Sequence, residues 1–399
     1  MATIYDDLGV RPVINAAGTL TRLGGSMMPP EVVEAMVQAA GRCVRMEELQ
    51  ERAGRIIADA TGAEDGYVTC GAAAGLTLAA AAAVAGLDIH KMERLPDTTG
   101  LKNEIIVQRP HRNSYDHALR AAGARLIEVG WLGHPVPRPV QDWEIEAAIN
   151  ERTAAIYWLD LPAIAANTVG LEATVKVARR HGVPVIVDAS SSLPPASNLR
   201  AFLAAGADLV AFSGGKALRG PQASGILAGR RSLIQSVALQ NQDMDVHVST
   251  WSLRTQLLES RKLPGPPLQG IGRGLKVGKE EIVGLLTALR LFLQRDEAGE
   301  QAAWLQQVSS IVNAVAALPE VRAEVIRPPG REVPLARLSW DEAKRGLTGA
   351  ALVNALAEGD PAICVGGDGN GGQITVNPFS LQAGDAEIIG QRLKKLLSS

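Results

Sequence analysis

The stretch DLVAFSGGKALRGPQ, residues 208–222, places a lysine where a buried strand is expected to end. Its apolar run LVAF has the composition of such a strand, and Ser213 and two glycines separate this run from Lys216. Burying an ammonium group is unfavourable unless its charge is paired or neutralised. Lys216 therefore indicates either a functional amine or, as the simpler alternative, a side chain on a solvated loop.

The segment around Lys216 belongs to a longer alternation of strand-like and helix-like segments. The strand-like runs are rich in Val and Ile, and amphipathic segments separate them. The runs are EIIVQ (104–108), RLIEVG (125–130), AAIYWLDL (154–161), VPVIVDAS (183–190), DLVAFSG (208–214) and SGILAG (224–229). Strands that are apolar along nearly their whole length are typical of a parallel sheet covered by helices on both faces. We therefore predict an α/β fold.

The sequence pattern changes after about residue 240. A Pro- and Gly-rich connector at 263–274 precedes a long helical pattern at 279–295, and short strands and helices then follow one another. These features predict two domains. An N-terminal segment and a large domain occupy residues 1–275, and a linking helix and a smaller α+β domain occupy 276–399.

The composition narrows the classes of protein to consider. The chain has 399 residues with a formal net charge of −2, and its lysines and arginines are scattered, so we expect no nucleic-acid partner. The longest apolar stretch, 71–87, is Ala-rich and short for a bilayer, which predicts a buried helix and no membrane association. Three isolated cysteines indicate no disulfide framework and no zinc site, so we expect no metal and a cytoplasmic location.

Three residues that can carry chemistry follow predicted strands: Asp188, Lys216 and His111. In open α/β sheets, ligands bind beyond the carboxyl ends of the strands. A neutral lysine attacks a carbonyl group to form a Schiff base, and a carboxylate beneath a pyridine ring keeps the ring nitrogen protonated. This lysine–aspartate pair is the one that holds pyridoxal 5'-phosphate (PLP). Taken singly, Asp188 could cap a turn and His111 could be a hydrogen-bonded structural residue.

A phosphate group needs a separate binding site, and VTCGAAAGLTL, residues 68–78, offers one. A strand-like run turns through Gly71 into an Ala-rich helix, whose first N–H groups can bind an anion. Ala72 and Ala73 are small enough to let a phosphate approach the backbone. Any helix that begins at a glycine gives a similar pattern, so this signal supports the hypothesis only together with Lys216 and Asp188.

Several stretches together resemble the selenocysteine synthase (L-seryl-tRNA selenium transferase) family, and within it the D-glucosaminate-6-phosphate ammonia-lyase branch. They are LGVRPVINAAGTLTRLGG (8–25), TGAEDGYVTCGAAAGLTLA (61–79), ERLPDTTGLKNEIIVQ (93–108), HGVPVIVDASS (181–191), DLVAFSGGKALRGPQASGILAGR (208–230) and GIGRGLKVGKEEIVGLLTAL (270–289). The resemblance implies a fold-type I PLP enzyme with a mostly parallel seven-stranded sheet. It also implies a small C-terminal domain and an active site at the interface of a homodimer or higher homo-oligomer.

The resemblance also implies roles for individual residues. Lys216 would form the Schiff base with PLP and later act as the proton-transfer base. Asp188 would pair with the pyridine nitrogen, and His111 would stack on the ring or contact it. Further cofactor-binding residues implied by the family are Gly71, Ala72, Ala73, Asn167, Ser190, Ser213 and Arg273.

The sequence departs from the ammonia-lyase branch where the substrate is expected to bind. Gly215 stands where that branch is expected to have His, and Arg219 stands where Gly is expected. For the substrate carboxylate we expect Arg337 in PLARLSW, with Arg219 as the alternative, and Tyr115 is a further expected substrate contact. Because Arg219 is specific to this sequence, it would mark the difference in substrate. The near-neutral charge makes tRNA an unexpected partner, so a small amino acid is the expected substrate.

These observations predict a PLP-dependent lyase of the ammonia-lyase or dehydratase type. Its substrate is expected to be a small polar or hydroxylated amino acid, with α,β-elimination yielding a 2-oxo acid and ammonia. A racemase, an epimerase or a retro-aldolase would use the same carbanion and is the first alternative. A non-catalytic α/β binding protein is the alternative from a different class.

Overall fold

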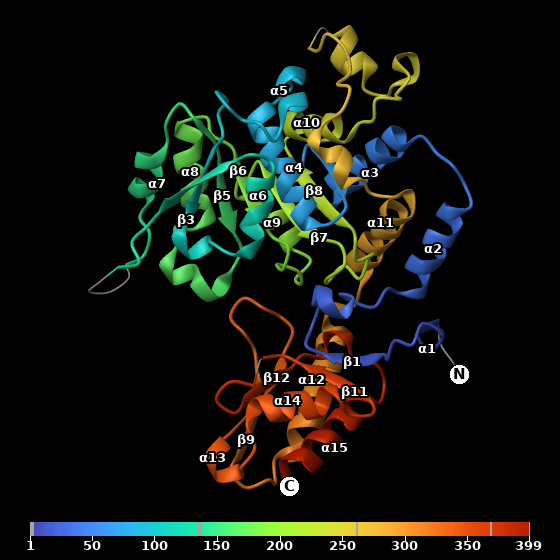
Figure 1. Cartoon of the computed structure of the whole chain (residues 1–399), viewed down its shortest axis with the longest axis vertical. Coiled ribbons are helices and arrows are strands. Elements are labelled where there is room, and N and C mark those ends of the chain that lie inside the picture. Colours follow the sequence, from blue (N-terminus) through green and yellow to red (C-terminus); the bar gives the residue numbers. More distant parts are fainter. Residues whose placement is uncertain (1–3, 134–137, 261, 368, 399) are drawn as a thin grey trace. The chain divides into compact units, whose positions relative to one another are not determined.

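The computed structural model describes residues 4–133, 138–260, 262–367 and 369–398, and the chain forms two compact units (Figure 1). The larger unit comprises residues 28–293, and the smaller comprises 1–27 together with 294–399. This division differs from the boundary after residue 275 expected from the sequence. The N-terminal segment groups with the C-terminal unit because β1 (Val13–Ala16) pairs in parallel with β11 (Ala362–Val365).

The larger unit contains the seven-stranded, mostly parallel sheet that the sequence predicted. Its strand order is β2-β8-β7-β6-β5-β3-β4. The strands are β2 (Asp65–Thr69), β3 (Glu104–Gln108), β4 (Arg125–Val129), β5 (Thr153–Leu159), β6 (Val185–Asp188), β7 (Leu209–Ser213) and β8 (Gly225–Gly229). Strands β7, β6, β5, β3 and β4 pair in parallel, whereas β8 is antiparallel to both of its neighbours. The turn that carries Lys216 therefore connects β7 to β8 at the carboxyl edge of the parallel strands.

Helices cover both faces of this sheet (Figure 1). The helices of the larger unit are α2 (Pro30–Ala40), α3 (Met46–Thr61), α4 (Ala72–Ala85), α5 (Ile89–Arg94), α6 (His117–Ala121), α7 (Asp142–Ala148), α8 (Leu171–Arg180), α9 (Asn198–Ala204), α10 (Arg231–Asn241) and α11 (Lys279–Gln294), which crosses into the smaller unit. Helix α4 packs against α5, α6 and α10 on one face, while α7 packs on α8 and α3 on α9.

The Ala-rich stretch noted in the sequence forms α4, which is buried along nearly its whole length against the central strands. Alanine side chains let this helix approach the sheet closely, and the helix shares a core with Tyr157, Ile186 and Ala211. Among the residues that the structure describes, no helix combines the length and the apolar character needed to cross a membrane.

The smaller unit is an α+β arrangement around an antiparallel sheet with the order β12-β10-β9. Its strands, besides β1 and β11, are β9 (Val321–Ile326), β10 (Leu335–Trp340) and β12 (Gln373–Val376). Its helices are α1 (Ile4–Asp7), α12 (Glu297–Val315), α13 (Glu342–Arg345), α14 (Gly349–Ala357) and α15 (Asp385–Ser398). Helices α12 and α15 pack together and bury a core of aliphatic side chains against the sheet.

Candidate functional site

Lys216 lies in the tight turn between β7 and β8, where its amine Nζ donates a hydrogen bond to Ser191 Oγ at 2.8 Å. The turn requires the glycines that precede the lysine. A Cβ at Gly214 would collide with the Ser224 side chain, and one at Gly215 would lie 2.5 Å from the Cα of Gln222. The backbone here is therefore too close to the returning chain for the histidine expected at the second of these positions, and Lys216 is the first side chain available to chemistry.

Asp188 is the last residue of β6 and is buried at the carboxyl end of the parallel strands. Both of its oxygens accept hydrogen bonds: Oδ1 from the Ser190 N–H at 3.0 Å, and Oδ2 from the Tyr157 hydroxyl at 3.1 Å. A carboxylate that is buried away from water needs such donors. Ser190, which donates to this carboxylate, is followed directly by Ser191, which accepts a hydrogen bond from the Lys216 amine.

His111 ends the short turn that follows β3, and its ring is buried. The Leu159 N–H donates to His111 Nδ1 at 3.4 Å, and the indole of Trp158 packs edge-on with ring centroids 5.5 Å apart. Burial lowers the pKa of His111 to about 4, because the charged imidazolium loses its hydration. The ring is therefore neutral at physiological pH, and since Nδ1 accepts a hydrogen bond, Nε2 carries the proton.

The start of α4 provides a place for a phosphate. Gly71 caps this helix with a φ of +120°, a conformation that strongly favours glycine, and no heavy atom lies within 4 Å of where its Cβ would be, among the residues described. The Thr69 hydroxyl donates a hydrogen bond to the Gly71 carbonyl at 2.8 Å. On the opposite side, Gly225 approaches so closely that a Cβ there would lie 2.6 Å from the Gly71 carbonyl carbon. The backbone N–H groups of Ala72 and Ala73 at this helix start suit an anion, and the open space lies at Gly71.

The remaining cofactor candidates lie at different depths. Ser213 is the final residue of β7 and pairs with Gly225, beside the start of α4. Ser190 lies at the site through its backbone N–H, which donates a hydrogen bond to Asp188. Asn167 is exposed in a turn after β5, where its carbonyl accepts the Val140 N–H at 3.1 Å. Contacts of these three side chains with a cofactor stay predictions.

Arg219 follows Lys216 by three residues and has a φ of +56°, which is uncommon for a residue other than glycine. Its N–H donates to the Lys216 carbonyl at 2.9 Å, closing the turn. The left-handed conformation explains why the family is expected to have glycine here. This chain has an arginine at a position where glycine would adopt the backbone conformation without strain.

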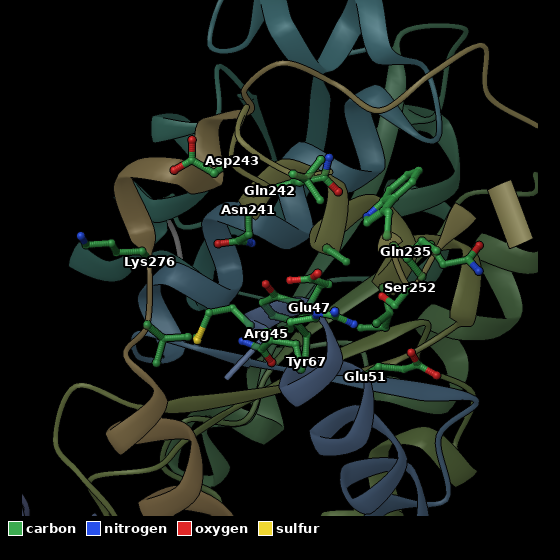
Figure 2. A pocket seen from close by; sticks show the side chains of 18 of the residues that line it. Arg45, Glu47, Glu51, Tyr67, Gln235, Asn241, Gln242, Asp243, Ser252 and Lys276 are labelled. Carbon is green, nitrogen blue, oxygen red and sulfur yellow. The ribbon is translucent and has the colours of Figure 1, made fainter. Parts of the chain in front are cut away.

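Arg273 and Lys276 border a separate pocket of about 560 Å³ in the larger unit (Figure 2). Side chains from the start of α3, from β2 and from the end of α10 surround it, and they include Glu47 and Tyr67. Arg273 forms an ion pair with Asp243 there. Within this chain the Arg273 guanidinium is therefore held by a carboxylate at that pocket, and a cofactor contact of Arg273 stays a prediction.

The two further candidates for substrate binding, Arg337 and Tyr115, are not buried. Arg337 lies in β10 of the smaller unit, where its Nε donates to Glu324 Oε1 at 2.8 Å. Tyr115 is 62% exposed, and its N–H donates to the side chain of Asn113 at 2.7 Å. A substrate carboxylate would have to displace Glu324 to reach Arg337.

Sequence reasoning missed two residues of this site, Tyr157 and Ser191. Tyr157 lies inside the run AAIYWLDL, where its hydroxyl looks like the polar tip of a core residue. Ser191 is one of three consecutive serines after Asp188, and their order gives no sign of which hydroxyl meets Lys216. A buried tyrosine needs a hydrogen-bond partner, and this was the signal available in the sequence.

The carboxyl edge of the sheet thus combines a lysine, a buried carboxylate, a neutral histidine and a helix start whose N–H groups suit an anion. This set fits PLP, which needs an amine for its aldehyde carbon, an acceptor for its ring nitrogen and N–H donors for its phosphate. Lys216, Asp188 and the backbone at Gly71 would hold those three parts. The fold and the site together define a fold-type I PLP-dependent enzyme.

The family follows from comparison with known proteins. The family model described as "L-seryl-tRNA selenium transferase" (SelA) matches residues 13–247, and the chain belongs to this family. It is 34% identical over 402 residues to 5'-C-glycyluridine monooxygenase-decarboxylase of Streptomyces sp., covering 98% of this chain and 92% of that protein. It is 30% identical over 400 residues to D-glucosaminate-6-phosphate ammonia lyase of Salmonella typhimurium, covering 98% and 97%.

The likeness extends to three-dimensional structure. A solved structure of D-glucosaminate-6-phosphate ammonia-lyase matches with a TM-score of 0.81 at 30% identity, covering all of this chain and 99% of that chain. A structure described as SPT with PLP has the same fold, with a TM-score of 0.55 at 12% identity. The expected fold class and family are therefore confirmed.

Proposed function

We propose that this chain is a PLP-dependent lyase that removes the β-hydroxyl group and then the amino group of a small hydroxylated amino acid. The observation that carries the proposal is the hydrogen bond from Lys216 to Ser191, in the segment that follows the buried carboxylate of Asp188, in a chain that resembles an ammonia lyase over nearly its full length. PLP, when bound, supplies an electron sink for the pair released at Cα.

The residues of the chain divide the remaining work. Lys216 would hold the cofactor, and its amine would then take the proton from the substrate Cα. Asp188 would keep the pyridine nitrogen protonated, and the neutral His111 ring would lie against the cofactor ring without adding charge. Loss of the β-hydroxyl as water, with the Cα–H electron pair forming the new double bond, gives an enamine. Water then hydrolyses the tautomeric imine to a 2-oxo acid and ammonia.

Recognition of the substrate is assigned to Arg219, with Arg337 and Tyr115 as the other candidates. A guanidinium three residues from Lys216 would bind a carboxylate or a phosphate ester of the substrate in two-point fashion. The assignment is supported by the backbone conformation of Arg219, which is unfavourable for arginine.

The assembly and location are part of the same proposal. We expect a homodimer or a higher homo-oligomer in the cytoplasm, acting on small molecules. Arg273 and Lys276 border the separate pocket of their own chain and would contribute to a neighbouring subunit, for which Arg273 would have to exchange its ion pair with Asp243.

A second candidate is oxidative decarboxylation of an amino acid. It is favoured by the 34% identity to a protein named 5'-C-glycyluridine monooxygenase-decarboxylase, which exceeds the 30% identity to the ammonia lyase. The same Lys216 and Asp188 would serve, with O₂ as the oxidant. The carboxylate would leave as CO₂, one oxygen atom of O₂ would enter the remaining amide product, and the other would leave as water. Racemisation and retro-aldol cleavage remain the alternatives that start from the same carbon.

The experiment is a substrate screen with the PLP-loaded protein and D- and L-hydroxy amino acids, with and without a phosphate ester, and glycyl nucleosides. Ammonia and 2-oxo acid, released in equal amounts without O₂ uptake, are the expected products. Consumption of O₂ with release of CO₂ would replace the lyase by the second candidate. A change of optical rotation, or aldehyde release, without either product would assign a racemase or a retro-aldolase. No turnover, with Lys216 unreactive toward PLP, would favour a binding protein.

A further inference from the structure

Tyr157 is a tyrosine whose hydroxyl meets the carboxylate proposed to bind the cofactor. Its side chain is 0% exposed, and it donates to Asp188 Oδ2 at 3.1 Å. The two residues come from adjacent parallel strands, β5 and β6, where Tyr157 pairs with Ile186 and Leu159 pairs with Asp188. They are therefore diagonal neighbours on the face of the sheet that α4 covers.

The phenol is a permanent donor. Burial raises the pKa of Tyr157 well above its usual range, and the negative charge of Asp188 raises this pKa further. The hydroxyl accordingly keeps its proton at any pH at which the protein would work. Since a carboxylate can only accept, the hydrogen bond has one direction, from Tyr157 to Asp188.

The acceptor sites of Asp188 are half used. An ionised carboxylate has about four lone-pair positions, and Ser190 N–H and Tyr157 hydroxyl occupy one on each oxygen. Acceptor positions thus remain for a third donor, such as a protonated pyridine nitrogen. The two protein donors stabilise the charged form of the carboxylate and hold its plane, so that a third donor meets a fixed anion.

Tyr157 also connects Asp188 to the loop that carries His111. The side chain of Asn113 offsets part of the burial-driven rise in the pKa of Tyr157, and it donates through Nδ2 to the His111 carbonyl at 3.1 Å. Asn113 therefore connects the His111 backbone to the surroundings of the Tyr157 hydroxyl, which donates to Asp188. Such a network fixes the relative positions of the two groups expected to contact one ring.

We propose that Tyr157 is a positioning residue that acts through Asp188 to keep the pyridine nitrogen of bound PLP protonated. Removing the hydroxyl would leave Asp188 with one protein donor, so that the proton shared with the ring nitrogen moves toward the carboxylate. The proposal rests on PLP as the cofactor and is independent of which substrate and which product the proposed function assigns.

The test compares Tyr157→Phe with wild-type protein loaded with PLP labelled with ¹⁵N in the ring, and needs no substrate. We expect the ring ¹⁵N resonance of the variant to shift toward the value of unprotonated pyridine. We also expect PLP affinity to fall about 10-fold, which corresponds to about 1.4 kcal/mol. Tyr67→Phe is the matched control, because Tyr67 is a buried tyrosine on β2, at the far edge of the same sheet. It should leave both readouts unchanged.

A second variant guards against loss of the buried tyrosine packing. Asn113→Ala leaves the Tyr157 ring in place and removes the influence of the Asn113 side chain on the Tyr157 hydroxyl, together with its bonds to the His111 carbonyl and the Tyr115 N–H, so it should shift the nitrogen resonance in the same direction by less. A Tyr157→Phe protein that folds and gives the wild-type resonance and affinity would overturn the proposal. If the Tyr157→Phe protein does not fold, an unchanged ¹⁵N resonance in Asn113→Ala would overturn the proposal. A failed substrate screen would affect neither measurement.

Discussion

Arg219 and Lys216 are joined by a backbone hydrogen bond of 2.9 Å, in which the N–H of the arginine meets the carbonyl of the lysine. The arginine reaches this geometry with a φ of +56°, the left-handed region that favours glycine. The turn that presents the candidate catalytic amine therefore depends on a residue whose type is unfavourable for its backbone. Backbone strain of this kind clusters at functional sites, which makes the arginine side chain itself a subject for experiment.

Arg219→Gly and Arg219→Ala separate the two properties of this residue. Both variants remove the guanidinium, but only glycine relaxes the backbone. We expect Arg219→Gly to be more stable than Arg219→Ala by about 1 kcal/mol in chemical denaturation. Both should lower kcat/KM for an anionic substrate by roughly 10-fold or more, the loss of a charge-assisted hydrogen bond, with PLP affinity little changed. An unaltered substrate profile in both variants would remove Arg219 from substrate recognition.

Lys216→Ala should abolish turnover and leave a folded protein. The wild-type protein incubated with PLP should show a visible band that borohydride bleaches, with the reduced adduct mapping to Lys216. The variant should show neither adduct nor turnover, while Lys176→Ala, a change on the exposed surface of α8, should behave as wild type. Full activity of Lys216→Ala would exclude covalent catalysis by this lysine.

His111 should make stability depend on pH below neutrality. Its pKa is lowered from 6.5 to about 4 in the folded protein, so between these values the unfolded chain binds a proton that the folded chain does not. The stabilisation is fully present above pH 6.5 and is lost as the pH falls toward 4, by about 3 kcal/mol in all.

Denaturant titrations between these pH values measure this effect. His111→Phe should flatten the dependence, since phenylalanine does not titrate. His90→Phe, which changes an exposed histidine, should leave the slope as in wild type. Equal slopes for wild type and His111→Phe would show that the imidazole does not lose its proton on folding.

Gly71→Ala tests the anion site at the start of α4. The φ of +120° is strained for alanine, and the new methyl group would enter the open space expected to hold the phosphate. We expect PLP affinity to fall at least roughly 10-fold, the equivalent of about 1.4 kcal/mol. Gly86→Ala is the control, because Gly86 caps the other end of the same helix, has a φ of +56° and also faces open space among the described residues.

Gly86→Ala should lower the free energy of unfolding by about 1–2 kcal/mol, because its backbone conformation is also strained for alanine. Its PLP affinity should be unchanged. Isothermal titration of the apoprotein with PLP measures the affinity of each variant. If both variants bind PLP like wild type, the phosphate lies elsewhere.

The sheet and its candidate chemistry were accessible from the sequence because they depend on local patterns. Near-continuous apolar runs identified the central strands, and Asp188, Lys216 and His111 stood out as polar residues where those runs end. Parallel strands bring their carboxyl ends to one edge, so residues far apart in the chain could be expected together. The buried Ala-rich helix α4 was equally visible, since small side chains and flanking glycines mark a closely packed helix.

What the tertiary structure alone decided depends on contacts between distant parts of the chain. The pairing of β1 with β11 moves the N-terminal segment out of the larger unit, and no local pattern reports such a pairing. The ion pairs that hold Arg337 and Arg273 likewise involve partners that spacing does not reveal. The sequence determined which residue types reach the edge of the sheet. Only the folded chain decided that Tyr157 donates to Asp188, because a hydrogen bond needs the register of two strands and the direction of two side chains.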